Sequence, residues 1–153
     1  MNGADDIFPK ERFTGIVLAG GKSTRFGASK SRLVFQGEPL AVRAYRALSG
    51  VFSRALVIAA EKDNLADLGL PVARDLLPEK GPLGGIYTAL KSIGTEYAFI
   101  MACDQPFVSP ALIRHICAAA VGCDVLAPRT EDLVFPLLAC YSKNCLPFVE
   151  DHI

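Results

Sequence analysis

The sequence predicts a three-layer, Rossmann-like α/β fold with a mostly parallel sheet. Short apolar runs, typical of strands that are buried on both faces, alternate with helix-like segments at the spacing of β-α units. A glycine-rich loop that carries several cations follows the first of these runs directly. In such folds ligands bind beyond the carboxyl ends of the strands. The residues that follow the predicted strands, at 20–30, 59–62, 75 and 104, are therefore the first candidates for a functional site.

Length and charge limit the kind of protein that this chain can be. Its 153 residues suit a single domain over 1–153, with residues 1–12 polar and expected to be frayed. The 16 basic and 16 acidic side chains cancel, which argues against nucleic-acid or membrane-surface partners. No apolar run approaches the ~20 residues of a membrane span, and the start lacks the features of a signal peptide. We expect a cytoplasmic protein.

The first half of the chain is predicted to hold three strands and one full helix. A buried strand runs from Gly15 through Leu18, and Pro39 opens a helix that Gly50 closes. Further elements are a strand at 55–60, a helical turn at 63–68 and a short strand at 71–73.

The second half continues the alternation and adds an irregular strand. A glycine segment at 81–85 precedes a helix to about residue 93, and Ser109 is the expected N-cap of a helix to about residue 120. Further elements are strands at 97–102, 124–127 and 134–140 and a helix at 146–153. Pro136 suggests that the strand at 134–140 lies at an edge or is bulged, because proline cannot donate a ladder hydrogen bond.

The loop after the first strand has the composition of a phosphate site. Gly20, Gly21 and Gly27 allow the backbone to approach and wrap an anion. Its cations are Lys22, Arg25 and Lys30. Two common glycine motifs do not fit: a Walker A loop would need glycine at position 16, where Ile16 stands, and the G-x-G-x-x-G fingerprint fails because the first glycines are adjacent. A mobile surface loop with solvated cations is the alternative.

Residues 18–30, LAGGKSTRFGASK, resemble the signature L-A-G-G-x-S-x-R-[MF]-G-x-x-K of the molybdenum cofactor guanylyltransferases. The resemblance implies the nucleotide-diphospho-sugar-transferase type of fold, and the Ala-Gly-Gly form favours guanylyl over cytidylyl transfer. Ser29 departs from the family pattern, which commonly has aspartate there. The similarity continues through Phe135-Pro136 to Ile153, and relatives extend for several tens of residues beyond, so we expect part of the acceptor side to lie outside this sequence.

Two carboxylates follow predicted strands and are candidates for direct ligand contacts. Asp104 comes straight after the strand at 97–102, and Mg²⁺ is usually held by one or two carboxylates with phosphate oxygens and water. A turn-forming acid before Gln105-Pro106 is the alternative. Asp75 could accept from the N–H groups of guanine or from ribose hydroxyls, or it could pair with Arg74 or Lys80 in a solvated loop.

The resemblance supplies a full set of expected site residues. It implies that Arg25 and Lys30 are catalytic and that Asp104, in a C-D-x-P-[FY] segment, binds Mg²⁺. The expected nucleotide-binding residues are Leu18, Ala19, Gly20, Gly21, Lys22, Ser23, Lys30, Asp75, Gly81, Pro82, Leu83, Gly84 and Asp104. The implied substrates are GTP and molybdopterin, with transient contact to cofactor-synthesis or acceptor proteins. Cytidylyl or sugar-phosphate transfer and non-catalytic nucleotide binding remain alternatives.

The cysteines are predicted to be reduced and mostly buried rather than to bind metal. There are five of them, with no C-x-x-C pair, and the two histidines do not complete a zinc set. A nucleophilic role for Cys103 is the alternative that we consider less fitting than a small apolar side chain in a strand.

Overall fold

The computed structural model describes residues 8–20, 29–60 and 65–153. Within these ranges a six-stranded sheet has the order β5-β4-β1-β6-β8-β7. The strands are Val72–Arg74 (β5), Ala55–Ala59 (β4), Phe13–Leu18 (β1), Tyr97–Ala102 (β6), Leu138–Ser142 (β8) and Val125–Leu126 (β7). The first four are mutually parallel, whereas β8 is antiparallel to both of its neighbours. The predicted α/β fold with a mostly parallel sheet and an antiparallel strand near the C-terminus is therefore confirmed.

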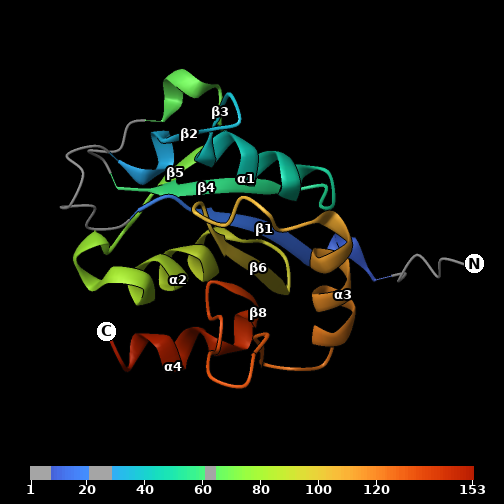
Figure 1. Ribbon diagram of the computed structural model, residues 1–153. Coiled ribbons are helices and arrows are strands. Elements are labelled where there is room, and N and C mark those ends of the chain that lie inside the picture. The colour runs from blue at the N-terminus through green and yellow to red at the C-terminus, as the bar shows by residue number, and fades with distance from the viewer. Residues whose placement is uncertain (1–7, 21–28, 61–64) are drawn as a thin grey trace, which may run out of the picture.

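Helices cover both faces of this sheet (Figure 1). Leu40–Ser49 (α1) and Pro110–Ala120 (α3) bury their apolar side chains on one face, and Gly81–Ser92 (α2) and Leu146–Glu150 (α4) cover the other. Ser109 caps α3 as predicted, since its hydroxyl accepts a 3.2 Å hydrogen bond from the Leu112 amide. The result is three layers with the sheet in the middle.

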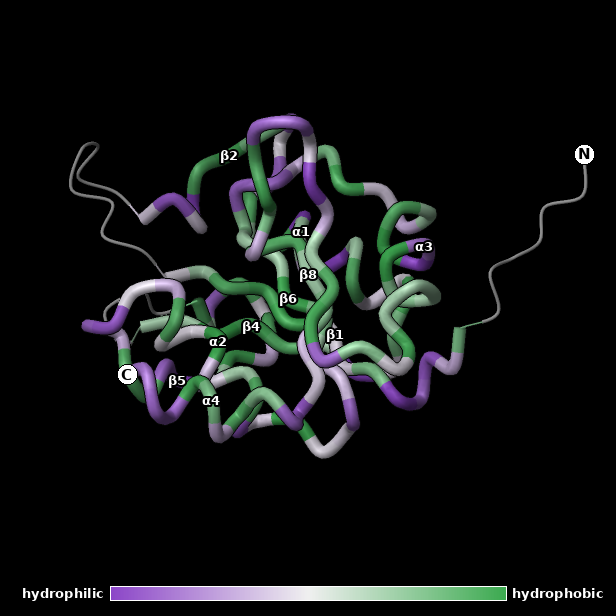
Figure 2. Tube along the Cα trace, turned by 90° about the horizontal axis from the view of Figure 1, so that it is seen from below, coloured by the Kyte–Doolittle hydropathy of each residue, from purple (hydrophilic) through white to green (hydrophobic). Residues whose placement is uncertain are grey.

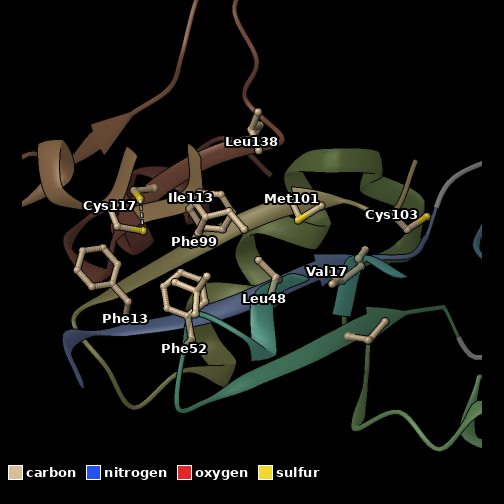
Figure 3. Close-up of a cluster of buried hydrophobic side chains, with 14 of the residues drawn as sticks. Phe13, Val17, Leu48, Phe52, Phe99, Met101, Cys103, Ile113, Cys117 and Leu138 are labelled. Carbon is tan, nitrogen blue, oxygen red and sulfur yellow. Dashed lines mark hydrogen bonds between the residues drawn. The ribbon is translucent and has the colours of Figure 1, made fainter. Parts of the chain in front are cut away.

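The central strands are buried on both sides, which explains their continuous apolar sequences. All six residues of β1 are buried. Because side chains alternate along a strand, Phe13 and Val17 join the core under α1 and α3, while Ile16 and Leu18 join the core under α2. Figure 3 shows the first of these cores, with Phe13, Phe52 and Phe99 close together and Leu48 between the layers. Figure 2 shows that hydrophobic residues concentrate in the inner strands.

A small hairpin that the sequence analysis did not predict leads into α1. Its strands are Val34–Phe35 (β2) and Glu38–Pro39 (β3), which pair antiparallel. Gln36 and Gly37 form the turn with positive φ angles of 52° and 82°, the conformation that suits a two-residue hairpin loop. Single 3₁₀ turns complete the described elements: Lys10–Arg12 (η1), Lys30–Arg32 (η2), Ala66–Leu68 (η3), Pro78–Lys80 (η4) and Lys143–Cys145 (η5).

Two predictions about strands need correction. The strand predicted at 134–140 begins only at Leu138, because a 3.2 Å hydrogen bond from the Leu138 amide to the Phe135 carbonyl closes a turn around Pro136. This strand, β8, is not at the edge of the sheet, since β6 and β7 flank it. The proline therefore marks the turn before the strand. The edge position falls to the two-residue strand β7, shorter than the predicted 124–127.

Two further boundaries differ from the expectation. The predicted frayed start does not extend to residues 8–12: Phe8 packs edge-on against Phe13 at a ring separation of 5.4 Å, and residues 10–12 form η1. The glycine segment at 81–85 is not a loop before the helix but the first turns of α2 itself. Part of the helical turn predicted at 63–68 lies outside the described residues, and its remainder is the 3₁₀ turn η3.

No helix in the described ranges has the length and apolar character that crossing a membrane would require.

Candidate active site

A cavity of about 990 Å³ lies at the carboxyl ends of the parallel strands. Leu18 and Gly20 from the end of β1, Ala60 after β4, and Asp75 after β5 contribute to its walls. The beginning of α2 supplies Gly81, Pro82 and Gly85 from the opposite side. The cavity thus occupies the place where ligands bind in open α/β sheets, and its volume suits a nucleotide-sized ligand.

Only some of the predicted nucleotide-binding residues line this cavity. Leu18, Gly20, Asp75, Gly81 and Pro82 line it, as expected for contact residues. The side chain of Ala19 instead packs in the core under α1 and α3, while Leu83 and Gly84 are not among the lining residues. Gly21, Lys22, Ser23 and Arg25 lie outside the described residues.

Glycines shape the start of α2 for two separate reasons. A Cβ atom on Gly84 would collide with the carbonyl oxygen of Leu77, so this position packs the helix against the preceding turn. A Cβ on Gly85 would lie 3.0 Å from Cδ1 of Leu18, so this position keeps the helix close to β1. Gly81 has a φ of 58°, which side chains rarely adopt. The segment therefore combines a tight entry with close packing, and Gly85 faces the cavity.

Asp75 is held in place by two donors. Its Oδ1 atom accepts a 3.0 Å hydrogen bond from the Leu77 amide and a 2.8 Å hydrogen bond from the Thr88 hydroxyl. The carboxyl group is buried, with 8% of the residue exposed, and it lines the cavity. Asp75 is therefore not a solvated loop acid. Thr88 was not predicted as a site residue, because a threonine in the middle of a helix gives no signal of its own.

The predicted cation Lys30 and the predicted metal ligand Asp104 meet in the structure. The Lys30 Nζ atom lies 3.4 Å from Oδ2 of Asp104, although 74 residues separate them. Both side chains stay accessible, at 55% and 46% of their surface. The Cys103 amide donates a 3.1 Å hydrogen bond to the Leu18 carbonyl, so the turn with Asp104 begins beside the end of β1.

Ser29 occupies the position where the resembled family commonly has aspartate. Its hydroxyl lies 2.6 Å from that of Ser31, which is fully buried. This contact fixes the start of η2, the turn that Lys30 begins. A hydrogen bond between two uncharged side chains therefore orders the backbone next to Lys30.

The Asp104 carboxylate is a suitable Mg²⁺ ligand, but the protein supplies no complete set of ligands around it in the described residues. In the part of the chain that the structure describes, no group of three or more histidine, cysteine or acidic side chains could hold a metal ion. Mg²⁺ does not need such a group, because it keeps several waters and takes phosphate oxygens as ligands. Lys30 and Asp104 are not among the residues that line the cavity, but Asp104 follows Ala102 of its wall by two residues. An accessible carboxylate at this place fits a metal that arrives with the nucleotide.

Several cavity residues were not among the predicted contacts. These are Ile58, Arg74, Pro78, Glu79, Lys80, Gly85, Ala102 and Leu137. The rule that ligands bind past strand ends identifies Ala60, within the predicted segment 59–62, and could also have identified Arg74, which ends β5. Leu137 could not be found this way, because it precedes the antiparallel strand β8 and its place depends on sheet order.

The fold and the cavity define the class of protein as a nucleotidyltransferase of the α/β type. The family described as the MobA-like NTP transferase domain matches residues 15–152. The chain therefore belongs to the MobA-like nucleotidyltransferase family, which confirms the resemblance seen at residues 18–30.

Individual relatives agree with this assignment. The chain is 36% identical over 140 residues to a protein of Pelotomaculum thermopropionicum named "Probable molybdenum cofactor guanylyltransferase", covering 92% of this chain and 68% of that one. It is also 36% identical to the molybdenum cofactor guanylyltransferase of Desulfosudis oleivorans, covering 92% and 70%. The crystal structure of molybdopterin-guanine dinucleotide biosynthesis protein A from Archaeoglobus fulgidus has a TM-score of 0.75 at 26% identity, covering 92% and 72%.

Proposed function

We propose that this enzyme transfers GMP from GTP to the terminal phosphate of molybdopterin with the help of Mg²⁺. The products are the guanine dinucleotide form of the cofactor and pyrophosphate. The observation that carries the proposal is the 3.4 Å contact between Lys30 and Asp104, two residues after Ala102 of the cavity wall, in a chain whose curated relatives are named for guanylyl transfer to the molybdenum cofactor.

The reaction is a displacement at phosphorus that needs no covalent intermediate on the protein. A terminal phosphate oxygen of the acceptor attacks the α-phosphorus of GTP, and the bond from that phosphorus to the oxygen bridging to the β-phosphate breaks. The electron pair leaves with pyrophosphate. The protein's tasks are to align the two anions and to stabilise the charge that builds on the phosphoryl oxygens.

Each assigned residue has one task in this scheme. Lys30 neutralises developing charge on the phosphate chain, and Arg25 is proposed for the same role from its place in the resembled signature. Asp104 would hold Mg²⁺, which would act as a Lewis acid and reduce the negative charge on the phosphates. Asp75 would accept from the base or the ribose with the carboxyl oxygen that Thr88 and Leu77 do not use. Gly20 and the following loop would approach the phosphates through backbone amides.

The experiment that tests this function is a substrate matrix. The protein is incubated with Mg²⁺, molybdopterin and each of GTP, CTP, ATP and UTP, and pyrophosphate release and product mass are measured. Asp104→Asn is the matched control, because it keeps the shape of the side chain and removes the charge. We expect the unmodified chain to bind GTP more tightly than the other three nucleotides and to transfer GMP slowly, and Asp104→Asn to transfer none. Transfer of CMP instead would move the enzyme to cytidylyl chemistry, and equal affinity for all four nucleotides would contradict the proposal.

A further inference from the structure

Arg43 of α1 joins two segments that are far apart in the sequence. Its Nε atom donates a 3.0 Å hydrogen bond to the carbonyl of Pro106, in the 105–108 turn that directly follows Asp104. Its guanidinium carbon lies 5.3 Å from the ring centroid of Phe35, in strand β2 of the small hairpin. The rings of Phe35 and Phe107 then meet edge to face at 5.4 Å and 84°. One side chain thus contacts both segments, which also contact each other.

These two segments carry the two charged groups of the proposed site. Lys30 begins η2, which leads directly into β2, and Asp104 precedes Pro106 by two residues. The two side chains are 3.4 Å apart, but both are about half exposed. Exposed ion pairs of this kind contribute little to holding segments together. The distance between the charges must therefore be set by what holds the backbone of each segment.

The side chains beneath the 105–108 turn do not hold its backbone in place. A cavity of about 330 Å³ lies between α1 and the start of α3, with Arg43, Gln105, Pro106 and Val108 in its walls. The side-chain oxygen of Gln105 is buried there without a hydrogen-bond partner. The turn therefore has room to move into this cavity. The hydrogen bond from Arg43 to the Pro106 carbonyl restrains it directly.

We propose that Arg43 is a positioning residue that fixes the distance between Lys30 and Asp104. The proposal rests on the function proposed above, because it concerns the same pair of charges. Arginine suits the task since its planar guanidinium can donate to a carbonyl and stack on an aromatic ring at once, which a lysine ammonium cannot do in the same geometry. Arg43 itself does not touch the reacting groups.

Loss of Arg43 is expected to impair chemistry more than nucleotide binding. The cavity walls at Gly20, Asp75 and Gly81 do not depend on Arg43, so the affinity for GTP is retained. A displacement of about 1 Å between groups that act on the same phosphate can cost roughly a hundredfold in rate. The metal ligand is displaced relative to the cation, so the Mg²⁺ requirement rises with the loss of kcat.

The kinetic test compares Arg43→Met with a matched arginine at the opposite end of the sheet. Arg12 also makes a cation–π contact, 5.5 Å above Tyr97, and hydrogen bonds to a side chain, that of Glu96. For Arg43→Met we expect kcat to fall roughly tenfold to a hundredfold. The Mg²⁺ concentration for half-maximal rate should rise, with the KM for GTP changed less than about threefold. Arg12→Met should leave all three values unchanged.

A conservative variant and a stability measurement separate positioning from simple support of the fold. Arg43→Lys keeps the charge and should show the defect of Arg43→Met, because it lacks the planar donor; full rescue by lysine would overturn the geometric role. Thermal unfolding of all three variants is measured alongside. If Arg43→Met loses stability but keeps the kcat and Mg²⁺ requirement of the unmodified chain, the positioning role is wrong.

A second measurement needs no substrate and therefore stands apart from the proposed function. The Val108 amide donates to the Gln105 carbonyl at 3.4 Å within the turn, so its hydrogen exchange reports on the order of that turn. We expect exchange at Val108 to be about threefold to tenfold faster in Arg43→Met than in Arg12→Met, the range for loss of one net hydrogen bond. Unchanged exchange would overturn the proposal. Faster exchange in a chain that binds all four nucleotides equally would refute only the proposed function.

Discussion

The Thr88 hydroxyl donates a 2.8 Å hydrogen bond to Oδ1 of Asp75 and at the same time accepts a 3.0 Å hydrogen bond from the Leu76 amide. Thr88 is buried at 1% exposure and comes from the middle of α2, whereas Asp75 follows β5. A helix on one face of the sheet therefore sets the orientation of a carboxylate at the carboxyl edge. This support leaves the other oxygen of Asp75 in a fixed position relative to the cavity.

Replacement of Thr88 by valine tests this support. Valine keeps the shape, but it removes the donor to Asp75 and the acceptor for the Leu76 amide. Leaving buried polar groups unpaired costs about 1–3 kcal/mol each, so we expect a lower free energy of unfolding in urea. Discrimination between GTP and ATP in binding titrations should also weaken. Thr88→Ser keeps the hydroxyl and should retain the discrimination; equal discrimination in the valine variant would show that Asp75 does not depend on Thr88.

Alanine substitutions at two glycines of the site should affect thermal stability and GTP binding separately. Gly84→Ala places a Cβ against the Leu77 carbonyl oxygen, and that clash should outweigh the ~1 kcal/mol by which alanine is the better helix residue. Gly20→Ala meets nothing closer than the Ala60 nitrogen at 3.9 Å, so the fold tolerates it. We expect Gly84→Ala to lower the Tm and Gly20→Ala to weaken GTP binding at an unchanged Tm, measured by calorimetry on both variants. The reverse pattern would contradict our account of this segment.

Much of the fold could be predicted because its signals are local. The strand at 97–102 and the helix capped by Ser109 have the bounds expected from apolar runs, capping residues and proline. The hairpin at Val34 to Pro39 was missed because Gln36 carries a positive φ without being one of the usual turn residues. The interior place of β8 was missed because sheet order depends on which strand β6 accepts as a partner.

Candidate site residues could be chosen where a chemically active side chain follows a strand end, and could not where a residue supports the site from elsewhere in the fold. Asp104 follows the buried strand β6 and Asp75 follows the short, mostly exposed strand β5, so both lie at the carboxyl edge of the sheet, where ligands bind. Thr88 and Arg43 could not, since one lies inside a helix and the other on a helix surface, and only the packing shows what they hold. Ala19 was predicted to bind the nucleotide, but its side chain belongs to the core on the other face of the sheet.

Lys30 should matter for turnover and not for stability. Its ion pair with Asp104 is exposed and spans 3.4 Å, so Lys30→Ala should change the Tm very little. Turnover should fall roughly a hundredfold, as when one donor to a developing oxyanion is removed. Arg32→Ala is the matched control, because Arg32, two residues after Lys30 in the same turn η2, forms a similar exposed pair with Asp67 at 2.7 Å. Equal turnover of the two variants in the pyrophosphate assay would remove Lys30 from the mechanism.

The cysteines offer a test of the core that does not depend on the reaction. The Sγ atoms of Cys117 and Cys140 lie 3.7 Å apart between α3 and β8, a contact drawn as a dashed line in Figure 3. Their contact, followed by burial, raises the pKa of the Cys117 thiol above its ordinary value of 9.0. Because the thiolate is the reactive form, this thiol should resist alkylation at pH 8. Cys123 is exposed and serves as the internal control.

Native protein treated with iodoacetamide at pH 8 should therefore be labelled at Cys123, whereas Cys117 and Cys140 should react only after unfolding. Peptide mass spectrometry gives the rate at each site. The same pKa shift has a consequence for stability: the folded state keeps the Cys117 proton that the unfolded state loses above pH 9.0, so the free energy of unfolding should be unaffected below that pH and decline above it. Cys117→Ala should reduce that alkaline decline. Labelling of Cys117 at the rate of Cys123 in the native protein would show that the core between α3 and β8 opens far more often than this packing allows.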